Sequence, residues 1–122
     1  MANDYSRKQN TDNYQTTIER RTNEGEELLR AVRATIRGFD DLVERNTNTE
    51  TWLKENRATV GRIYTDGGIA EPFLAVTGID LGGISHQDIY EQLDAIVSGQ
   101  ITALRELTEK TRAWDEREMA PA

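Results

Sequence analysis

Two long stretches of this chain carry a heptad repeat, and no other pattern in the sequence limits the fold as strongly. Seam positions recur at alternating steps of four and three residues. In the first stretch, the residues at the seam positions are Ile18, Thr22, Gly25, Leu29, Val32, Ile36, Phe39 and Val43. In the second stretch, they are Tyr90, Leu93, Val97, Gln100, Leu104, Leu107, Thr111 and Trp114. This spacing predicts α-helices that pack on other helices at shallow angles, as in a bundle or a coiled coil.

Each of these helices needs a partner, in the same chain or in a second copy, because only 36% of the residues are apolar. Thr22, Gln100 and Thr111 are polar residues at seam positions. Such residues lower stability but specify register and oligomeric state, as a built assembly requires. The alternative is that the seams become polar where helices splay into water at the ends of a bundle.

Capping signals predict the boundaries of the first two helices. Residues 16–19 (TTIE) match a capping box, so the first helix is expected over residues 16–45. Residues 46–49 (NTNT) are expected to interrupt it with a short turn, because Asn and Thr favour caps and turns over helix continuation. The alternative is one long helix with a kink at these residues. A second capping box follows at once and predicts a shorter helix over residues 49–64.

The last helix has the clearest start signal in the chain. Ser85 and Asp88 are spaced as a capping box, and Ile84 and Ile89 stand where a hydrophobic staple would form. We therefore expect a helix over residues 86–117. Its apolar residues occupy more than one stripe, which indicates contact with more than one partner element.

The predicted fold class is all-α, with one elongated helical bundle or hairpin. Two long helices, 16–45 and 86–117, pack antiparallel, and the shorter helix 49–64 packs against them. The alternative is a longer parallel coiled coil, in which the first helix pairs with its own symmetry mate. Trp52 and Trp114 lie on the predicted apolar faces and are expected to fill the core.

Residues 14–117 are expected to form a single helical domain. Residues 1–13 are polar and rich in Asn, which predicts a flexible arm, and residues 118–122 predict a flexible tail. The alternative for the arm is that it becomes ordered on a neighbouring subunit. The N-terminal residues contain no apolar run typical of a signal peptide, so we expect the protein to be cytoplasmic on synthesis.

A glycine-rich apolar loop is predicted over residues 65–85, which hold five of the nine glycines. Flexible linkers are polar or Gly/Ser-rich, so a loop this apolar should pack on something. Pro72 is placed to open a short helical turn through Val76. The candidate partner contacts in the loop are Phe73, Leu74, Ile79 and Leu81.

The net charge of −7 argues against nucleic acid as a partner, because phosphate contacts need clustered positive charge. Twelve Arg accompany only three Lys, and Thr occurs fourteen times. An acidic, Lys-poor and Thr-rich surface is typical of proteins adapted to a high-salt cytoplasm. A GC-rich genome explains the preference for Arg equally well, although it does not explain the acidity.

A basic stripe formed by Arg30, Arg33 and Arg37 is the second candidate partner contact. It would meet an acidic partner, such as the acidic end of the last helix. The residues of that end are Glu106, Glu109, Asp115 and Glu116. The alternative is a lattice of ion pairs within the first helix, at the four-residue spacing of Glu26 with Arg30 and Arg37 with Asp41.

No motif predicts an enzyme, a cofactor or a metal site. The chain has no Cys, and its one His, His86, has no second ligand at a metal-binding spacing. The glycines form neither a P-loop nor a dinucleotide fingerprint, and they fit turns. Carboxylate pairs lie among Arg residues on predicted helix faces, which favours a solvated surface over acid–base catalysis. No apolar run approaches membrane-spanning length, and nothing indicates a small-molecule substrate.

The sequence thus favours a non-enzymatic structural or assembly subunit that forms a helical homo-oligomer. By analogy of architecture, such a protein suits a connector or another minor component of a virus particle. The alternative is a small regulatory adaptor that binds one other protein through an exposed helical seam. The packing of residues 65–85 distinguishes these two candidate functions. In a subunit ring these residues should pack on a neighbouring subunit, and in an adaptor they should pack on the helices of their own chain.

Overall fold

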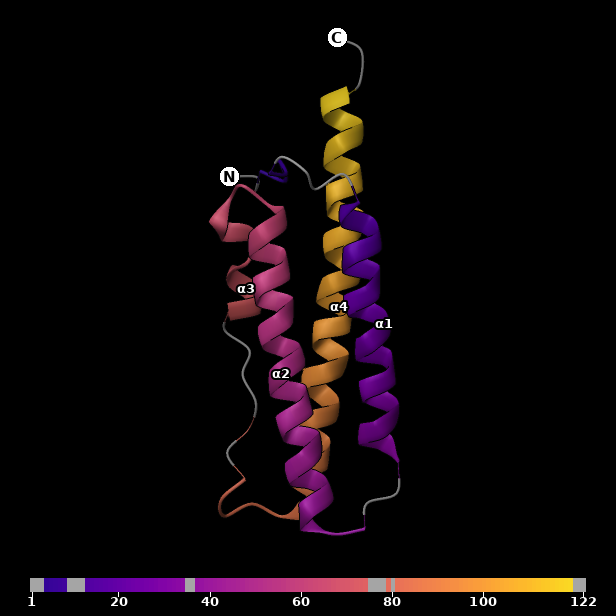
Figure 1. Cartoon of the computed structure of the whole chain (residues 1–122), viewed down its shortest axis with the longest axis vertical. Helices are drawn as coiled ribbons and strands as arrows, with labels where there is room; N and C mark the ends of the chain where they lie inside the picture. The colour runs from indigo at the N-terminus through magenta and orange to yellow at the C-terminus, as the bar shows by residue number, and fades with distance from the viewer. Residues whose placement is uncertain (1–3, 9–12, 35–36, 75–78, 80, 120–122) are drawn as a thin grey trace.

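The computed structural model describes residues 4–8, 13–34, 37–74, 79 and 81–119, and they form an all-α bundle, as predicted. Its long helices are α1 (Tyr14–Arg33), α2 (Phe39–Ile63) and α4 (His86–Met119). A 3-10 turn, η1 (Gly67–Ile69), and a single turn, α3 (Glu71–Leu74), connect α2 to α4. Figure 1 shows that α1 runs antiparallel to both α2 and α4. The antiparallel packing expected of the first and last helices is therefore present.

The predicted break at residues 46–49 is wrong, because these residues lie inside α2. The chain instead leaves the helical conformation after Arg33, where Ala34 is extended at φ −69° and ψ 161°. Arg45 stabilises this end of α1, since its Nη1 donates to the carbonyl oxygens of Val32 and Ala34 at 3.4 and 3.3 Å. Thr49 is buried within α2, and its Oγ1 donates to the Arg45 carbonyl, 2.8 Å away, one turn earlier, so its hydroxyl is satisfied without capping a helix.

The new break changes where the first heptad seam ends. Ile18 and Val32 are fully buried, whereas Phe39 and Val43 are 46% and 38% exposed. A helix that restarts at Phe39 does not keep the heptad phase of α1, so the prediction that these two residues continue its seam is wrong. Ile36 lies outside the described residues.

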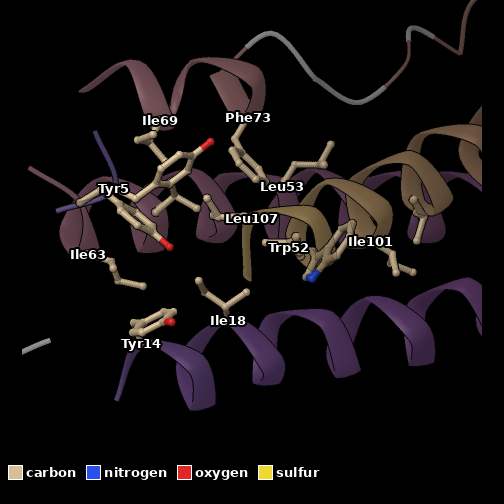
Figure 2. Close-up of a cluster of buried hydrophobic side chains, with 14 residues drawn as sticks. Tyr5, Tyr14, Ile18, Trp52, Leu53, Ile63, Ile69, Phe73, Ile101 and Leu107 are labelled. Carbon is tan, nitrogen blue, oxygen red and sulfur yellow. The ribbon is translucent and has the colours of Figure 1, made fainter. Parts of the chain in front are cut away.

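The second seam packs as expected along α4. Leu93, Val97, Leu104 and Leu107 are buried. Tyr90 and Trp114 at its two ends are half-buried, as is Leu29 on α1. The main core cluster also holds Trp52 and Leu53 from α2 and Ile101 from α4 itself (Figure 2).

Gly25 is buried in α1 because the indole ring of Trp52 on α2 packs directly against it. A Cβ atom at Gly25 would lie 2.3 Å from Trp52 Cζ2 and 3.0 Å from Ile101 Cγ1. Trp52 Nε1 also donates to the Arg21 carbonyl oxygen of α1 at 2.9 Å. The glycine at a seam position thus allows the close approach of α1, α2 and α4.

The polar seam residues are buried. The hydroxyl of Thr22 donates to the Ile18 carbonyl at 3.0 Å, and that of Thr111 donates to the Leu107 carbonyl at 2.7 Å. Tyr64 Oη lies 2.6 Å from Thr111 Oγ1. By contrast, Oε1 of Gln100 and both amide atoms of Asn56 are buried with no hydrogen-bond partner in the described part of the chain.

Residues 4–8, part of the expected flexible arm, lie along the C-terminal end of α2. The amide of Lys8 donates to the Ile63 carbonyl at 2.8 Å, and that of Thr65 donates to the Ser6 carbonyl at 3.0 Å. Arg7 lies over the Tyr14 ring, 4.4 Å from its centroid, and pairs with Asp115 at 2.6 Å. These contacts join the N-terminal segment to α1, α2 and α4.

The two outer capping boxes have different outcomes. The amide of Asp88 donates to Ser85 Oγ at 3.1 Å, and α4 begins at His86, so the predicted start of this helix is confirmed. The start of the first helix is earlier than predicted, since α1 begins at Tyr14 and Asn13 makes no side-chain cap bond.

The glycine-rich segment folds back on helices of its own chain. Ile69 and Phe73 are buried in the main core cluster. Ile79 and Leu81 are half-buried against a second cluster at the opposite end of the bundle. Pro72 lies in α3, as the predicted helical turn required, while Val76 and the side chain of Leu74 lie outside the described residues.

Candidate interaction surface

Phe39 and Val43 are the exposed large apolar side chains of the described residues. They lie one turn apart at the start of α2, so their side chains share one face of the helix. A single exposed Leu or Val is ordinary on a protein surface, but an adjacent pair that includes a Phe is a candidate contact for another protein.

The pair lies beside the smaller core cluster of the protein. Its buried members come from all three long helices: Val32, Leu42, Ile89 and Leu93. The half-buried apolar residues packed around them are Ile79, Leu81, Ile84 and Tyr90. We call Phe39, Val43 and these four half-buried residues the end surface. It occupies the end of the bundle where α1 ends and α2 and α4 begin (Figure 1).

His86 belongs to this surface as an aromatic neighbour. Its ring stacks on that of Phe39, with centroids 5.9 Å apart and planes inclined by 26°. His86 is exposed, and the stacking partly orders the Phe39 side chain without burying it. The described residues contain no group of three or more His, Asp or Glu side chains that could hold a metal ion.

Asn46 attaches the loop of the end surface to α2, and the sequence prediction missed this role. Its Nδ2 donates to the Ile79 carbonyl at 3.0 Å, and its Oδ1 accepts from the Ile79 amide at 3.1 Å. The side chain therefore satisfies both main-chain groups of one loop residue, as a neighbouring strand would. An Asn at a buried helical position, in phase with Leu42 and Leu53, was the available signal.

Acidic residues border the exposed pair on α2. Asp40 and Glu44 each follow one member of the pair in sequence, and both are exposed. Asp41 accepts a hydrogen bond from the Arg37 amide at 2.8 Å and so caps the first turn of α2. On α4, the exposed Glu91 accepts from Gln87 at 3.1 Å.

The predicted basic stripe is divided by the break after α1. Arg33 forms a two-point ion pair with Asp94 of α4, at 2.6 and 3.2 Å. The Arg33 guanidinium lowers the pKa of Asp94, mainly through this hydrogen bonding. Arg30 is exposed on α1, and Arg37 lies in the connection before α2.

The predicted ion pairs differ from those observed. Glu26 pairs with Arg105 of α4 and not with Arg30 as expected. Of the acidic end of α4, Asp115 pairs with Arg7 of the N-terminal segment. These pairs join separate elements of the bundle, which sequence spacing along one helix does not reveal.

A groove of about 430 Å³ lies between α1 and α4. Residues of both signs line it, including Glu19, Glu109, Arg105 and Arg112. Because Arg105 is already paired with Glu26, the groove offers no converging set of like groups for a charged ligand. It is therefore a weaker candidate than the end surface.

Comparisons with known proteins return no relative: no family model matches the chain, and no curated protein or solved structure matches it significantly. Among the helices of the described residues, none has both the length and the apolarity needed to span a lipid bilayer.

Proposed function

We propose that this protein is a non-enzymatic adaptor that binds one protein partner through the end surface. The observation that carries the proposal is the exposure of Phe39 and Val43 beside a small apolar cluster. Apolar area left in water at one end of a bundle is stabilised when another protein covers it.

The glycine-rich segment supports the adaptor over the ring-forming subunit. Ile69 and Phe73 contribute to the main core of their own chain, and Asn46 holds Ile79 against α2. A segment that packs in this way needs no neighbouring subunit to bury it. Phe39 and Val43, by contrast, have no such cover in the described part of the chain.

Binding without catalysis also fits the chemistry of the described side chains. His86 stacks on Phe39, and Asp94 is ion-paired with Arg33. The buried amides of Asn56 and Gln100 are not nucleophiles, acids or bases. None of these groups forms the nucleophile–base–orienting-group arrangement that a catalytic site requires.

A capture experiment tests the proposal. The wild-type protein is immobilised, exposed to extract of the source cells, and compared with the double variant Phe39→Ser/Val43→Ser. The matched control is Ala58→Ser/Ala95→Ser, which changes two exposed helical positions away from the end surface. We expect one protein to be captured by the wild type and the control and to be lost with the double variant. Equal capture by all three would contradict the proposal, provided that circular dichroism shows the variants to be folded.

The second candidate is a homo-oligomeric assembly subunit, including a minor or connector component of a virus particle. The observation that favours it is the length of α4, which extends beyond the ends of α1 and α2 (Figure 1). Its seam continues to the half-buried Trp114 near this extension. Light scattering during size exclusion, at about 0.1 M and about 2 M salt, tests it, since the Debye length falls from about 10 Å to below 3 Å. A discrete oligomer supports this candidate, and a monomer at both salt concentrations excludes it.

A further inference from the structure

We infer that the end surface binds a basic amphipathic segment, in which apolar residues are flanked by Arg or Lys, and not a second copy of this chain. The inference rests on the proposed function and adds the chemistry of the partner. Its basis is the arrangement of charges around Phe39 and Val43 and which of those charges are already paired.

The exposed apolar pair has the spacing of a helix-docking site. Phe39 and Val43 follow one another by four residues along α2, so they present a short apolar stripe about 6 Å long, at 1.5 Å per residue. Apolar residues spaced by three or four along a helix form the ridges through which helices pack on one another, so a second helix can lie along this stripe. The stacked ring of His86 extends this stripe toward α4.

The acidic residues that flank the stripe are not engaged in ion pairs among the described residues. Asp40 is in the first turn of α2, where the helix dipole stabilises a carboxylate. A role in helix stability therefore accounts for the presence of Asp40. Glu44 lies beyond the first turn and has no such explanation. Glu50, half-buried two turns after Val43, lies in phase with the stripe itself and adds a carboxylate at its far end. On α4, Asp88 and Glu91 are exposed near His86.

Arg33 is neutralised by an ion pair at this end, whereas Arg37 and Arg45 remain cations and are outnumbered by the nearby carboxylates of Asp40, Asp41, Glu44, Asp88 and Glu91. Arg33 is paired with Asp94, and Arg45 donates to the carbonyl groups at the end of α1. Arg30 is on α1 and Arg37 is in the connection that leaves it, before the stripe begins. The charge beside the exposed pair on α2 is therefore negative.

A second copy fits this surface poorly. The chain carries a net charge of −7, and the contact of two end surfaces would bring the acidic borders together. Like charges placed opposite one another across an interface disfavour association, whereas a basic partner gains from the same residues. Attraction between opposite charges also accelerates encounter, and salt weakens it.

The experiment is a selection from a displayed library of random helical peptides. Peptides are selected on the wild-type protein and counter-selected on the folded Phe39→Ser/Val43→Ser variant, so the survivors depend on the end surface. We expect the survivors to carry apolar residues one turn apart with flanking Arg or Lys. Fluorescence anisotropy then measures their affinity for Glu44→Gln and for the matched control Glu27→Gln, an exposed residue of α1. Glu44→Gln should weaken binding by about two- to fivefold, as exposed charge pairs do, and Glu27→Gln should not.

Three results would overturn the inference in different ways. Survivors that are neutral or acidic would show that the end surface binds protein but that basic charge is not the recognition feature. A dimer that forms without peptide and is lost in Phe39→Ser/Val43→Ser would make a second copy the occupant. If no peptide depends on the end surface and the capture experiment is also negative, the proposed function itself fails.

Discussion

At the scale of single residues, Gly25 shows how one side chain sets the spacing of the bundle. Gly in a helix interior costs about 1 kcal/mol relative to Ala, so its presence in α1 has to be offset. The contact with Trp52 offsets this cost. The Trp52 ring occupies the space where a Cβ of residue 25 would be, and its indole N–H donates to the Arg21 carbonyl. Packing, and not helix propensity, determines the residue here.

We expect Gly25→Ala to destabilise the protein. Overpacking a core costs about 1–3 kcal/mol, which exceeds the propensity gained by replacing a helical glycine. Gly99→Ala is the matched control, because nothing lies within 4 Å of a Cβ built at this exposed position of α4. The control should be more stable than the wild type by about 0.5–1 kcal/mol. Urea denaturation followed by circular dichroism measures both, and a stabilised Gly25→Ala would show that the helices are not held this closely.

Tyr64 makes stability sensitive to alkaline pH. Burial raises the pKa of its phenol to about 12, against an ordinary value of 10.0, while the hydrogen bond with Thr111 acts in the opposite direction. The folded state thus favours the neutral phenol more than the unfolded chain does. This contribution to stability is complete below about pH 10 and is lost as the pH rises to about 12.

Tyr64→Phe tests this dependence. At neutral pH we expect it to lose about 1 kcal/mol with the hydroxyl contact, since Thr111 keeps its bond to the Leu107 carbonyl. From pH 10 upward its unfolding free energy should fall less steeply than that of the wild type. Chemical denaturation at a series of pH values measures the two slopes, and parallel curves would mean that Tyr64 ionises equally easily in both states.

At the scale of the element, α2 contains two buried Asn residues that differ in whether their side-chain amides are hydrogen-bonded. Asn46 satisfies both main-chain groups of Ile79, whereas both amide atoms of Asn56 lack a partner among the described residues. A buried polar group without a partner costs free energy, and its replacement by an apolar residue of similar size can stabilise a protein. The same change at a satisfied position leaves the partner groups unpaired.

We therefore expect Asn56→Leu to raise the unfolding free energy and Asn46→Leu to lower it, each by about 1–2 kcal/mol. Asn46→Leu should also increase amide hydrogen exchange at Ile79, because that amide loses its acceptor. The two variants are each other's control, since both place Leu on one helix. If Asn56→Leu is the less stable of the two, its amide has a partner in solution.

At the scale of the whole molecule, the two ends of the bundle differ in how they are closed. At one end the N-terminal segment covers the C-terminus of α2, through Tyr5, Arg7 and Lys8. At the other end, Asn46 anchors the loop at Ile79, but Phe39 and Val43 stay in water. This asymmetry is why we place the partner at the end surface and not along the side between α1 and α4, which Glu26–Arg105 already joins.

The sequence alone determined the fold class and most of the core, because heptad spacing and the Ser85 cap act locally along one helix. It predicted the seam residues of α4 and of α1, and it indicated that the glycine-rich segment would pack. It did not predict where α1 ends, since residues 46–49 carry local cap signals but lie inside α2, where Thr49 is buried and Asn46 bonds to Ile79, 33 residues away. Nor did it predict the exposure of Phe39 and Val43, which follows from that boundary. Tertiary contacts decided these points because the burial of one large apolar side chain, such as Leu42 or Leu53, contributes about 1.5–3 kcal/mol, whereas differences in local propensity are about 1 kcal/mol or less per residue.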